Sequence, residues 1–405
     1  MEAALARVFK FVRAAKSLLR RIEPFNIAAM QIPDLFQPPP RLLMGPGPSS
    51  VAPSVLKAQS LPLVGHLDPA FVKMMEEIKG MLREVFQTKN EMTFPISGTG
   101  SAGMEFCLVN LIEPGDEVVI GVNGVFGTRM VDVAERCGAK VTKVEAPWGR
   151  IIEPQQVAEA LKKCRAKLVA IVHAETSTGA LTPVEEISRM AHEAGALMML
   201  DTVTSLGGCP VRLDDWQVDA VYSGTQKCLS CPPGLSPVSL SKRAMEVATH
   251  RKGKVQSWYL DVNLLASYWG QERVYHHTAP ISMNYGLHEA LRLVLLEGLE
   301  NRWRRHQENH LALKDGLKAM GLSLASQEGH QLWQLNAIAV PEGIDEAAVR
   351  KRLLTEHNIE IGAGLGPLKG KIWRVGLMGE TSSAGNVKTF LSAFASLLKD
   401  AGFKR

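Results

Sequence analysis

Several features that mark specialised classes of protein are scarce or missing in this chain of 405 residues. It has only 6 cysteines, too few at this length for a disulfide framework. No apolar run reaches the roughly 18 residues needed to span a membrane. The net charge of +5 is modest and gathers largely in the first 21 residues, so it does not indicate nucleic-acid binding. Internal repeats and low-complexity blocks are also missing.

The composition is that of an ordinary globular chain, with 46% hydrophobic and 21% charged residues. Its length allows two or three domains, or one large domain with a smaller one. Cys228 and Cys231 form one C-x-x-C pair, but no second pair and no histidines follow at zinc spacing. We therefore predict no metal site.

The N-terminal segment is basic, amphipathic and poor in acids over residues 3–22. This pattern is typical of a mitochondrial transit peptide. An ordinary helix, or extra residues before a start at Met30, would explain it as well. We expect residues 1–29 to be a transit peptide or an N-terminal extension, and the protein to be cytoplasmic, or mitochondrial in the first case. A proline-rich stretch from Pro33 to Pro40 separates this segment from the body.

Short apolar runs alternate with amphipathic stretches between Glu91 and Ser241. Such alternation predicts an α/β fold, with a mostly parallel sheet covered by helices on both faces. The chain after about Gly253 mixes strand-like and helix-like runs differently, which predicts a smaller α+β domain. We expect a large domain over residues 45–290 and a small one over 291–405, and we expect residues 30–44 to be an N-terminal segment that becomes part of the small domain. Long helices are predicted over Tyr285–Arg302 and Trp303–Met320.

Two chemically distinctive residues follow buried strands. Asp201 ends the run Leu197–Leu200, and Lys227 follows the run Asp219–Tyr222. Ligands of parallel sheets bind at the carboxyl ends of the strands, so both residues could share one crevice. A lysine and an acid suit pyridoxal phosphate, the lysine as Schiff-base partner and the acid beside the pyridinium nitrogen. A solvated lysine and a helix-capping aspartate would fit the same pattern.

Three further strand ends carry candidate cofactor contacts. Ser97–Ser101 opens a helix with small residues and hydroxyls, which suits a phosphate, although a tight turn would fit too. It is not a Rossmann fingerprint, because Met104 stands at the third-glycine position. Phe126 could stack on a pyridine ring or belong to the core. The hydroxyl of Thr176 could reach the ring oxygen or cap a helix.

Together these motifs resemble the alanine–glyoxylate and serine–pyruvate aminotransferases, class V enzymes of fold type I that use pyridoxal 5'-phosphate. The resemblance runs from Leu43 to the C-terminus. Its specific stretches are Ser97–Ser101, Asn123–Arg129, Glu175–Gly179, Tyr222–Lys227, Tyr275–Thr278 and Trp373–Leu377. It implies an enzyme that moves the amino group of alanine or serine to glyoxylate or pyruvate. The sequence does not settle the preferred donor.

The resemblance also implies a role for each matched residue. Lys227 would form the Schiff base and move the α-proton, and Asp201 would pair with the pyridinium. The cofactor ring would lie between Val203 and Phe126, with Thr176 beside it. The other implied contacts are the phosphate ligands Thr99, Gly100, Ser101 and Gln226, the partner-subunit phosphate ligands Tyr275 and Thr278, and the substrate contacts Arg374 and Gly47. Mammalian members carry tryptophan where Phe126 stands, and some members carry serine at Thr176.

Some of these assignments have competitors. Tyr275–Thr278 could form a surface turn, and Arg374 could be a charge at a sheet edge, although a buried arginine in a strand needs an anion. Cys228 could be a reactive thiol or a packed side chain. A cysteine desulfurase of the same fold would need a cysteine on a mobile loop, which the sequence does not offer near Arg374. Other class V activities, such as serine–glyoxylate transfer, or a non-catalytic ligand sensor remain alternatives.

Overall fold

The computed structural model of the chain describes residues 33–404. The chain divides into two units, residues 1–40 and 41–405. Only residues 33–40 of the first unit are described, and they form no helix or strand. The predicted transit peptide or extension at residues 1–29 lies outside the described residues, so that prediction remains open. All that follows concerns the second unit.

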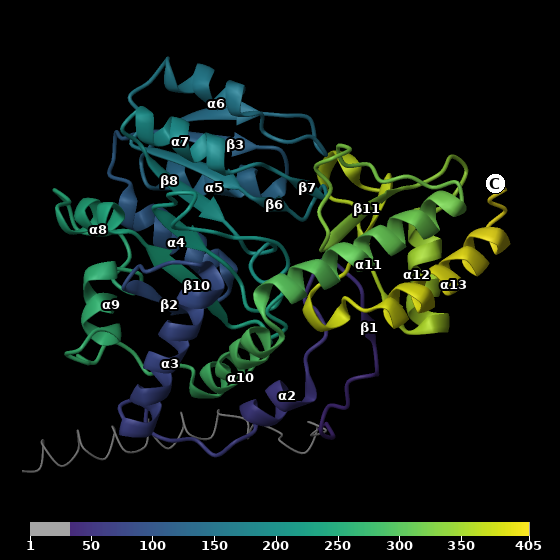
Figure 1. Cartoon of the computed structure of the whole chain (residues 1–405), viewed down its shortest axis with the longest axis horizontal. Helices are drawn as coiled ribbons and strands as arrows, with labels where there is room; N and C mark the ends of the chain where they lie inside the picture. Colours follow the sequence, from purple (N-terminus) through teal and green to yellow (C-terminus); the bar gives the residue numbers. More distant parts are fainter. Residues whose placement is uncertain (1–32, 405) are drawn as a thin grey trace, which may run out of the picture. The chain divides into compact units, whose positions relative to one another are not determined.

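A seven-stranded sheet is the centre of this unit (Figure 1). Six of its strands are parallel, and only β10 runs antiparallel to both of its neighbours. In sheet order the strands are β2 (Met92–Ser97), β10 (Leu235–Leu240), β9 (Ala220–Tyr222), β8 (Leu197–Asp201), β5 (Leu168–Val172), β3 (Glu117–Val122) and β4 (Lys140–Glu145). The mostly parallel sheet predicted from the alternating pattern is confirmed.

Helices cover both faces of the sheet and bury two separate apolar clusters. Successive residues of β3 alternate between them: Val118 and Ile120 belong to the first cluster and Val119 to the second. The first is packed beneath α4 (Gly100–Leu111), α5 (Val125–Arg136), α8 (Lys242–Thr249) and α9 (Val262–Trp269), and the second beneath α2 (Pro53–Gln59), α6 (Pro154–Leu161) and α7 (Glu185–Glu193). Helix α3 (Pro69–Phe86) contributes to both. Burial of these two clusters is what holds the sheet between its helical layers.

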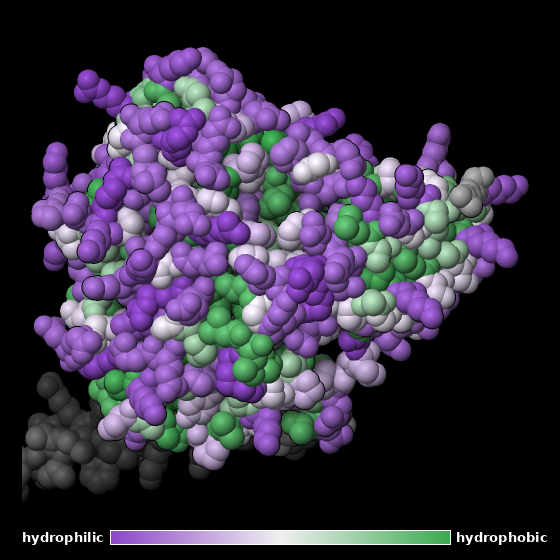
Figure 2. Space-filling view, in the orientation of Figure 1, coloured by the Kyte–Doolittle hydropathy of each residue, from purple (hydrophilic) through white to green (hydrophobic). Residues whose placement is uncertain are grey.

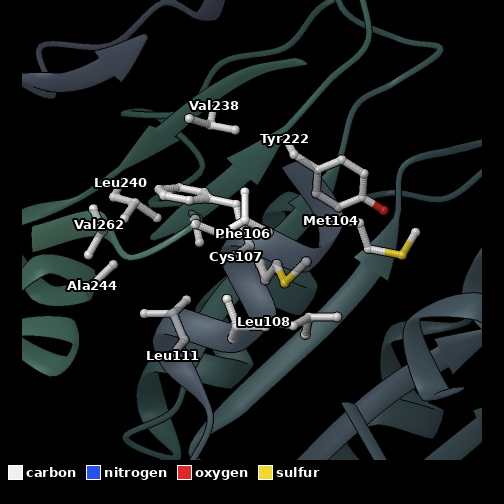
Figure 3. Close-up of a cluster of buried hydrophobic side chains, with 14 of the residues drawn as sticks. Met104, Phe106, Cys107, Leu108, Leu111, Tyr222, Val238, Leu240, Ala244 and Val262 are labelled. Carbon is white, nitrogen blue, oxygen red and sulfur yellow. The ribbon is translucent and has the colours of Figure 1, made fainter. Parts of the chain in front are cut away.

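Figure 3 shows part of the first cluster, with the side chains of α4 packed against β9 and β10. Phe106 lies among the apolar side chains, while the hydroxyl oxygen of Tyr222 points away from Phe106 and Leu240. A buried O–H group is costly unless it makes a hydrogen bond. We therefore expect a hydrogen-bond partner for this hydroxyl near the carboxyl end of β9.

The C-terminal part forms the smaller α+β domain that the sequence predicts, with its own apolar cluster. Its antiparallel sheet has the order β11-β14-β13, and β1 pairs in parallel with β12. The elements are β1 (Leu42–Leu43), β11 (Leu335–Ala339), β12 (Ile359–Glu360), β13 (Gly362–Ala363), β14 (Ile372–Gly376), α11 (Leu299–Ala319), α12 (Glu346–His357), α13 (Ala384–Asp400) and the 3₁₀ turns η2 (Gly366–Leu368) and η3 (Gly379–Thr381). Helix α10 (Ile281–Glu297) instead packs on α2 and α3 of the large domain, and its buried hydrophobic residues belong to the second apolar cluster. The exact domain limits stay a prediction.

The boundary between the two long helices differs from the prediction, which put it after Arg302. The break falls at Gly298, whose φ is 80°, so α10 ends at Glu297 and α11 begins at Leu299. A glycine adopts this left-handed backbone easily, and it commonly ends helices. Across the break, the buried side chain of Arg302 in α11 pairs with Glu297, the last residue of α10, at 2.5 Å.

Candidate active site

Lys227 and Asp201 lie at the carboxyl ends of neighbouring strands, as their sequence positions predict. Strands β8 and β9 pair in parallel, and Asp201 is the last residue of β8. Lys227 is 8% exposed and Asp201 is 3% exposed, so neither is a solvated surface charge. Burial, together with the smaller effect of the Arg374 charge, lowers the pKa of Lys227 to about 8. The described chain therefore holds a buried amine that loses its proton more readily than an ordinary lysine.

Two hydrogen bonds hold the Asp201 carboxylate. Its Oδ1 accepts from the backbone N–H of Val203 at 2.8 Å, and its Oδ2 accepts from the Tyr222 hydroxyl at 2.5 Å. Turns, and no α-helix, follow Asp201 in the structure, so the helix-cap alternative is wrong. Burial raises the pKa of Asp201 to about 7, and both hydrogen bonds oppose that rise because they favour the charged form.

Helix α4 presents its N-terminus at the same edge of the sheet. Thr99 is the N-cap, its side chain makes no capping hydrogen bond, and both Thr99 and Ser101 are exposed. A Cβ added to Gly100 would lie 3.1 Å from Val203, and one added to Gly224 would lie 2.8 Å from Oε1 of Gln226. That buried oxygen has no partner among the described residues. The exposed hydroxyls of Thr99 and Ser101, the latter accepting from Arg129 at 3.2 Å, form with the backbone N–H groups and the two glycines a cradle that suits a phosphate.

Phe126 and Thr176 approach from two other strand ends. Phe126 lies in the first turn of α5, half-buried against the first apolar cluster, with the guanidinium carbon of Arg129 5.1 Å from its ring centroid. Thr176 is buried and follows β6 (Ala174–Glu175), which pairs with β7 (Ala180–Leu181). A tight hairpin, and no helix, therefore surrounds Thr176, so the helix-cap alternative for this residue is wrong.

Arg374 comes from the small domain but reaches the same residues. It lies in β14, the middle strand of its sheet, so it is not an edge charge. Its Nε donates to the Ala363 carbonyl at 2.7 Å, and one terminal nitrogen donates to the Thr176 carbonyl at 3.2 Å. Arg374 is 7% exposed, and burial lowers its pKa to about 10 while the charge of Glu175 opposes that change. A buried guanidinium of this kind favours an anionic ligand.

Gly47 lies directly against the lysine. Its φ is 104°, and an added Cβ would lie 2.5 Å from Nζ of Lys227. The lysine Nζ also donates to the Pro46 carbonyl, and Ser49 Oγ donates to the Lys227 carbonyl at 2.7 Å. The segment around Gly47 is therefore fitted to the lysine, with no room for a larger side chain.

Tyr275 and Thr278 are not brought to the lysine within one chain. Both are exposed, Tyr275 by 60%, and no hydrogen bond among residues 33–404 joins either to the residues above. Between them, His277 contacts Ser97 Oγ at 2.7 Å, and His276 stacks on Trp258 with ring centroids 4.4 Å apart. Within residues 33–404 no group of three or more His, Cys, Asp or Glu side chains is arranged to hold a metal ion.

The cysteines beside the lysine are packed side chains. Cys228 and Cys231 are buried, and burial raises the pKa of each thiol to about 12. The nucleophilic form of cysteine is the thiolate, which such a pKa suppresses. The structure therefore gives no support to a reactive thiol at Cys228 or to the persulfide chemistry of a desulfurase.

Comparison with known proteins identifies the family. A model described as aminotransferase class V matches residues 56–370. The (S)-ureidoglycine–glyoxylate transaminase of Bacillus subtilis (strain 168) is 41% identical over 378 residues, covering 89% of this chain and 91% of that protein. The alanine–glyoxylate aminotransferase of Callithrix jacchus is 40% identical over 371 residues, covering 91% and 90%. The chain is a class V aminotransferase.

A crystal structure agrees with this assignment. The alanine–glyoxylate aminotransferase of Nostoc sp. superposes with a TM-score of 0.91 at 50% identity, over 93% of this aminotransferase and 100% of that chain. The predicted fold type I architecture is confirmed, and with it dependence on pyridoxal 5'-phosphate, the cofactor of this family. The lysine, the buried acid and the phosphate cradle fit that group. None of the helices in residues 33–404 is both long and apolar enough to cross a bilayer.

The sequence pattern of this aminotransferase does not predict that Tyr222 and Glu175 contact site residues. Tyr222 lies in an apolar strand, a position typical of a core residue, yet its hydroxyl donates a hydrogen bond to Asp201. Glu175 stands in a polar stretch and reads as a surface acid, yet its exposed fraction is 0%. Only the pairing of β8 with β9, and the packing of the β6–β7 hairpin on α5, reveal what these side chains touch.

Proposed function

We propose that this class V aminotransferase moves the amino group of alanine or serine to glyoxylate, with pyruvate as a second acceptor. The observation that carries the proposal is that Asp201 at the end of β8, Lys227 in the turns after β9 and Arg374 in β14 lie close enough for their charges to act on the pKa of Lys227. Relatives that span about nine tenths of the chain are named for glyoxylate as acceptor. Ureidoglycine is a second candidate donor, because it is named in the Bacillus subtilis relative.

Lys227 would hold the cofactor aldehyde and then move the proton at the substrate α-carbon. Its lowered pKa, about 8, makes the neutral amine available to act as nucleophile and base. The bound cofactor supplies an electron sink for the electrons left at that carbon. Asp201 would face the pyridine nitrogen, and its two hydrogen bonds favour the carboxylate form that keeps this nitrogen protonated.

The remaining cofactor contacts would be made to its phosphate and to the two faces of its ring. The N-terminus of α4 would bind the phosphate through Thr99, Gly100 and Ser101, and Gln226 would add its side-chain amide. Val203, packed close to Gly100, would cover one face of the ring. Phe126 would stack on the other face, and Thr176 would donate to the ring oxygen.

Arg374 would bind the substrate carboxylate. Its planar guanidinium offers two parallel N–H groups, which match the two oxygens of a carboxylate. Gly47 would line the substrate pocket beside Lys227, where any side chain larger than hydrogen would collide with the lysine.

We also propose that the enzyme is a homodimer in which Tyr275 and Thr278 reach the phosphate of the partner subunit. In the single chain the Tyr275 ring lies 5.5 Å from His66 on an exposed surface. Large apolar side chains are exposed in the same region, namely Leu61, Leu63, Leu67, Trp258, Tyr259 and Val274. On the face drawn in Figure 2, apolar residues gather along the lower part among polar ones. Exposed apolar surface of this kind is typical of a protein interface.

The cellular compartment that we propose for the enzyme depends on the role of residues 1–29. We assign the enzyme to the cytoplasm, or to the mitochondrial matrix if residues 1–29 act as a transit peptide. Mass spectrometry of the N-terminus of protein purified from its source distinguishes the two, because a transit peptide is removed on import.

A panel of donors and acceptors tests the proposed activity. Purified enzyme is mixed in turn with alanine, serine and ureidoglycine, and conversion of the cofactor from its pyridoxal to its pyridoxamine form is followed by absorbance. Glyoxylate or pyruvate is then added to reverse the change. Conversion by alanine or serine with reversal by glyoxylate is expected. Sulfide release from cysteine without such conversion would favour a desulfurase and contradict the proposal.

A further inference from the structure

Glu175 is a fully buried acid whose hydrogen-bond partners all donate to it. Oε1 accepts from the Ser177 N–H at 3.1 Å and from the Ser177 hydroxyl at 2.5 Å, and Oε2 accepts from the Phe126 N–H at 3.2 Å. Burial raises the pKa of Glu175, and these hydrogen bonds oppose the rise. A buried carboxyl is costly unless it is paired, and a carboxyl that only accepts hydrogen bonds is suited to the ionised form.

One of these donors, the Phe126 N–H, belongs to the start of α5, a helix whose own N-cap residue offers no capping side chain. Its N-cap residue is Gly124, which has no side chain. In its place, Ser177 Oγ accepts from the Val125 N–H at 3.0 Å, and Glu175 accepts from Phe126. A Cβ on Gly124 would collide with Glu175 and Ser177. The β6–β7 hairpin thus caps the helix from outside, and a carboxylate at a helix N-terminus is favoured by the helix dipole.

The same hairpin carries the contact to the substrate arginine. Thr176 lies between the two capping residues, and its carbonyl accepts from Arg374 at 3.2 Å. Among residues 33–404, Glu175 is the only acid whose charge acts on the pKa of Arg374, where it opposes the effect of burial. One short segment therefore contacts both the backbone that carries the Phe126 ring and the guanidinium proposed to bind substrate.

We propose that Glu175 is a positioning residue of the active site: its carboxylate caps α5 from the hairpin, which fixes Phe126 against the cofactor ring, and it serves as a buried counter-charge to Arg374. This inference rests on the proposed roles of Phe126 and Arg374. It predicts two separable effects, because the cap acts on cofactor affinity and the counter-charge acts on carboxylate affinity.

A double-mutant cycle tests the cap. The dissociation constant of pyridoxal phosphate is measured by fluorescence titration of apoprotein for wild type, Glu175→Ala, Phe126→Ala and the double variant. Glu175→Ala should weaken cofactor binding by about tenfold, the order expected for loss of a helix cap. In the Phe126→Ala background the same change should add little, because the ring that it positions is already gone. Glu346→Gln, at a buried glutamate paired with Arg350 in α12, is the matched control and should leave the constant unchanged.

Glu175→Gln tests the counter-charge. Glutamine keeps the shape and one accepting oxygen but removes the charge, so Arg374 should bind anions more tightly. The Kd of propionate, an alanine analogue without the amino group, should fall several-fold in the holoenzyme, and the KM of alanine should fall with it. A purely structural role would lower the stability of the apoprotein to urea without this gain in carboxylate affinity.

The outcomes separate this inference from the proposed function. Unchanged cofactor affinity in Phe126→Ala would contradict the proposed stacking role itself. If Phe126→Ala weakens cofactor binding, two results would overturn only the inference about Glu175. Either Glu175→Ala has no effect on cofactor binding, or the effects of the two substitutions on cofactor binding are fully additive. Where Glu175→Ala fails to fold, Ser177→Ala removes part of the cap and keeps the charge; it should weaken cofactor binding without tightening propionate, and a variant that changes neither overturns the capping role.

Discussion

Tyr222 donates its phenolic hydrogen to Oδ2 of Asp201 across two neighbouring strands, with 2.5 Å between the oxygens. The two residues are register partners of the parallel β8–β9 pair, and both are buried. Burial works against the charge of Asp201, whereas this hydrogen bond favours it. The tyrosine therefore stabilises the ionised carboxylate that the cofactor nitrogen requires.

Tyr222→Phe should raise the pKa of Asp201 above its value of about 7 in the apoprotein, because a hydrogen bond to the charged form is lost. Such a bond is worth about 1.5–3 kcal/mol. A carboxyl whose folded pKa exceeds its ordinary 3.8 stabilises the fold while it is protonated, and that contribution is lost as the pH rises through the folded value. Urea unfolding of the apoprotein over a pH series should show this loss displaced to higher pH.

Asp201→Asn is the control for this series, because it lacks the titrating carboxyl. Its unfolding free energy should show no loss in the window between 3.8 and about 7. If Tyr222→Phe and wild type lose stability at the same pH, the hydrogen bond has no influence on the ionisation of Asp201.

The positions of Lys227 and Asp201 could be predicted because both follow short buried runs, and local pattern is enough to recognise such strand ends. The contact of Tyr222 with Asp201 could not be, because it depends on the register of two strands separated by about twenty residues. Glu175 was missed for a related reason: an acid in a polar loop looks solvated until the packing of the hairpin on α5 is known. The break at Gly298 was misplaced because continuous apolar periodicity hides a single left-handed residue.

Lys227→Ala should abolish covalent attachment of the cofactor while the protein still folds, because the aldehyde has lost its nucleophilic amine. Borohydride treatment of the holoenzyme followed by peptide mass spectrometry should find the cofactor on the wild-type Lys227 peptide and on no peptide of the variant. The exposed Lys242 provides a matched control, and Lys242→Ala should behave as wild type. Near-normal transaminase turnover in Lys227→Ala would refute the assignment.

Arg374→Lys should weaken the binding of amino donors by something like 10-fold or more, with little change in cofactor affinity. Lysine keeps a positive charge but loses the planar fork that meets a carboxylate at two points, and it cannot make both bonds to Ala363 and Thr176. Donor KM and the cofactor Kd report the two effects separately. Arg352→Lys, on the surface pair with Glu356, is the control. Unchanged donor affinity with release of cofactor would mean that Arg374 binds the phosphate instead.

Tyr275→Phe combined with Thr278→Val should raise the cofactor dissociation constant. Each lost hydrogen bond to the phosphate anion is worth about 1.5–3 kcal/mol. If these residues reach the partner's phosphate, the cofactor is held by both subunits, and its removal should weaken the dimer. Sedimentation of the apoprotein and holoenzyme over a dilution series measures this linkage. An apoprotein that dimerises as tightly as the holoenzyme would argue that no cofactor contact crosses the interface.

A mixed dimer decides whether the contact crosses the interface. Lys227→Ala chains are combined with Tyr275→Phe/Thr278→Val chains, so each dimer holds one of each. If the contact crosses the interface, the site that has alanine at position 227 also receives the substituted residues 275 and 278 from its partner. That site then lacks both the lysine and the phosphate contacts. The other site keeps its own lysine, borrows an intact Tyr275 and Thr278, and should bind cofactor with wild-type affinity. If the residues act within their own chain, as the His277–Ser97 contact would allow, the one site with a lysine must show the weak affinity of the double variant.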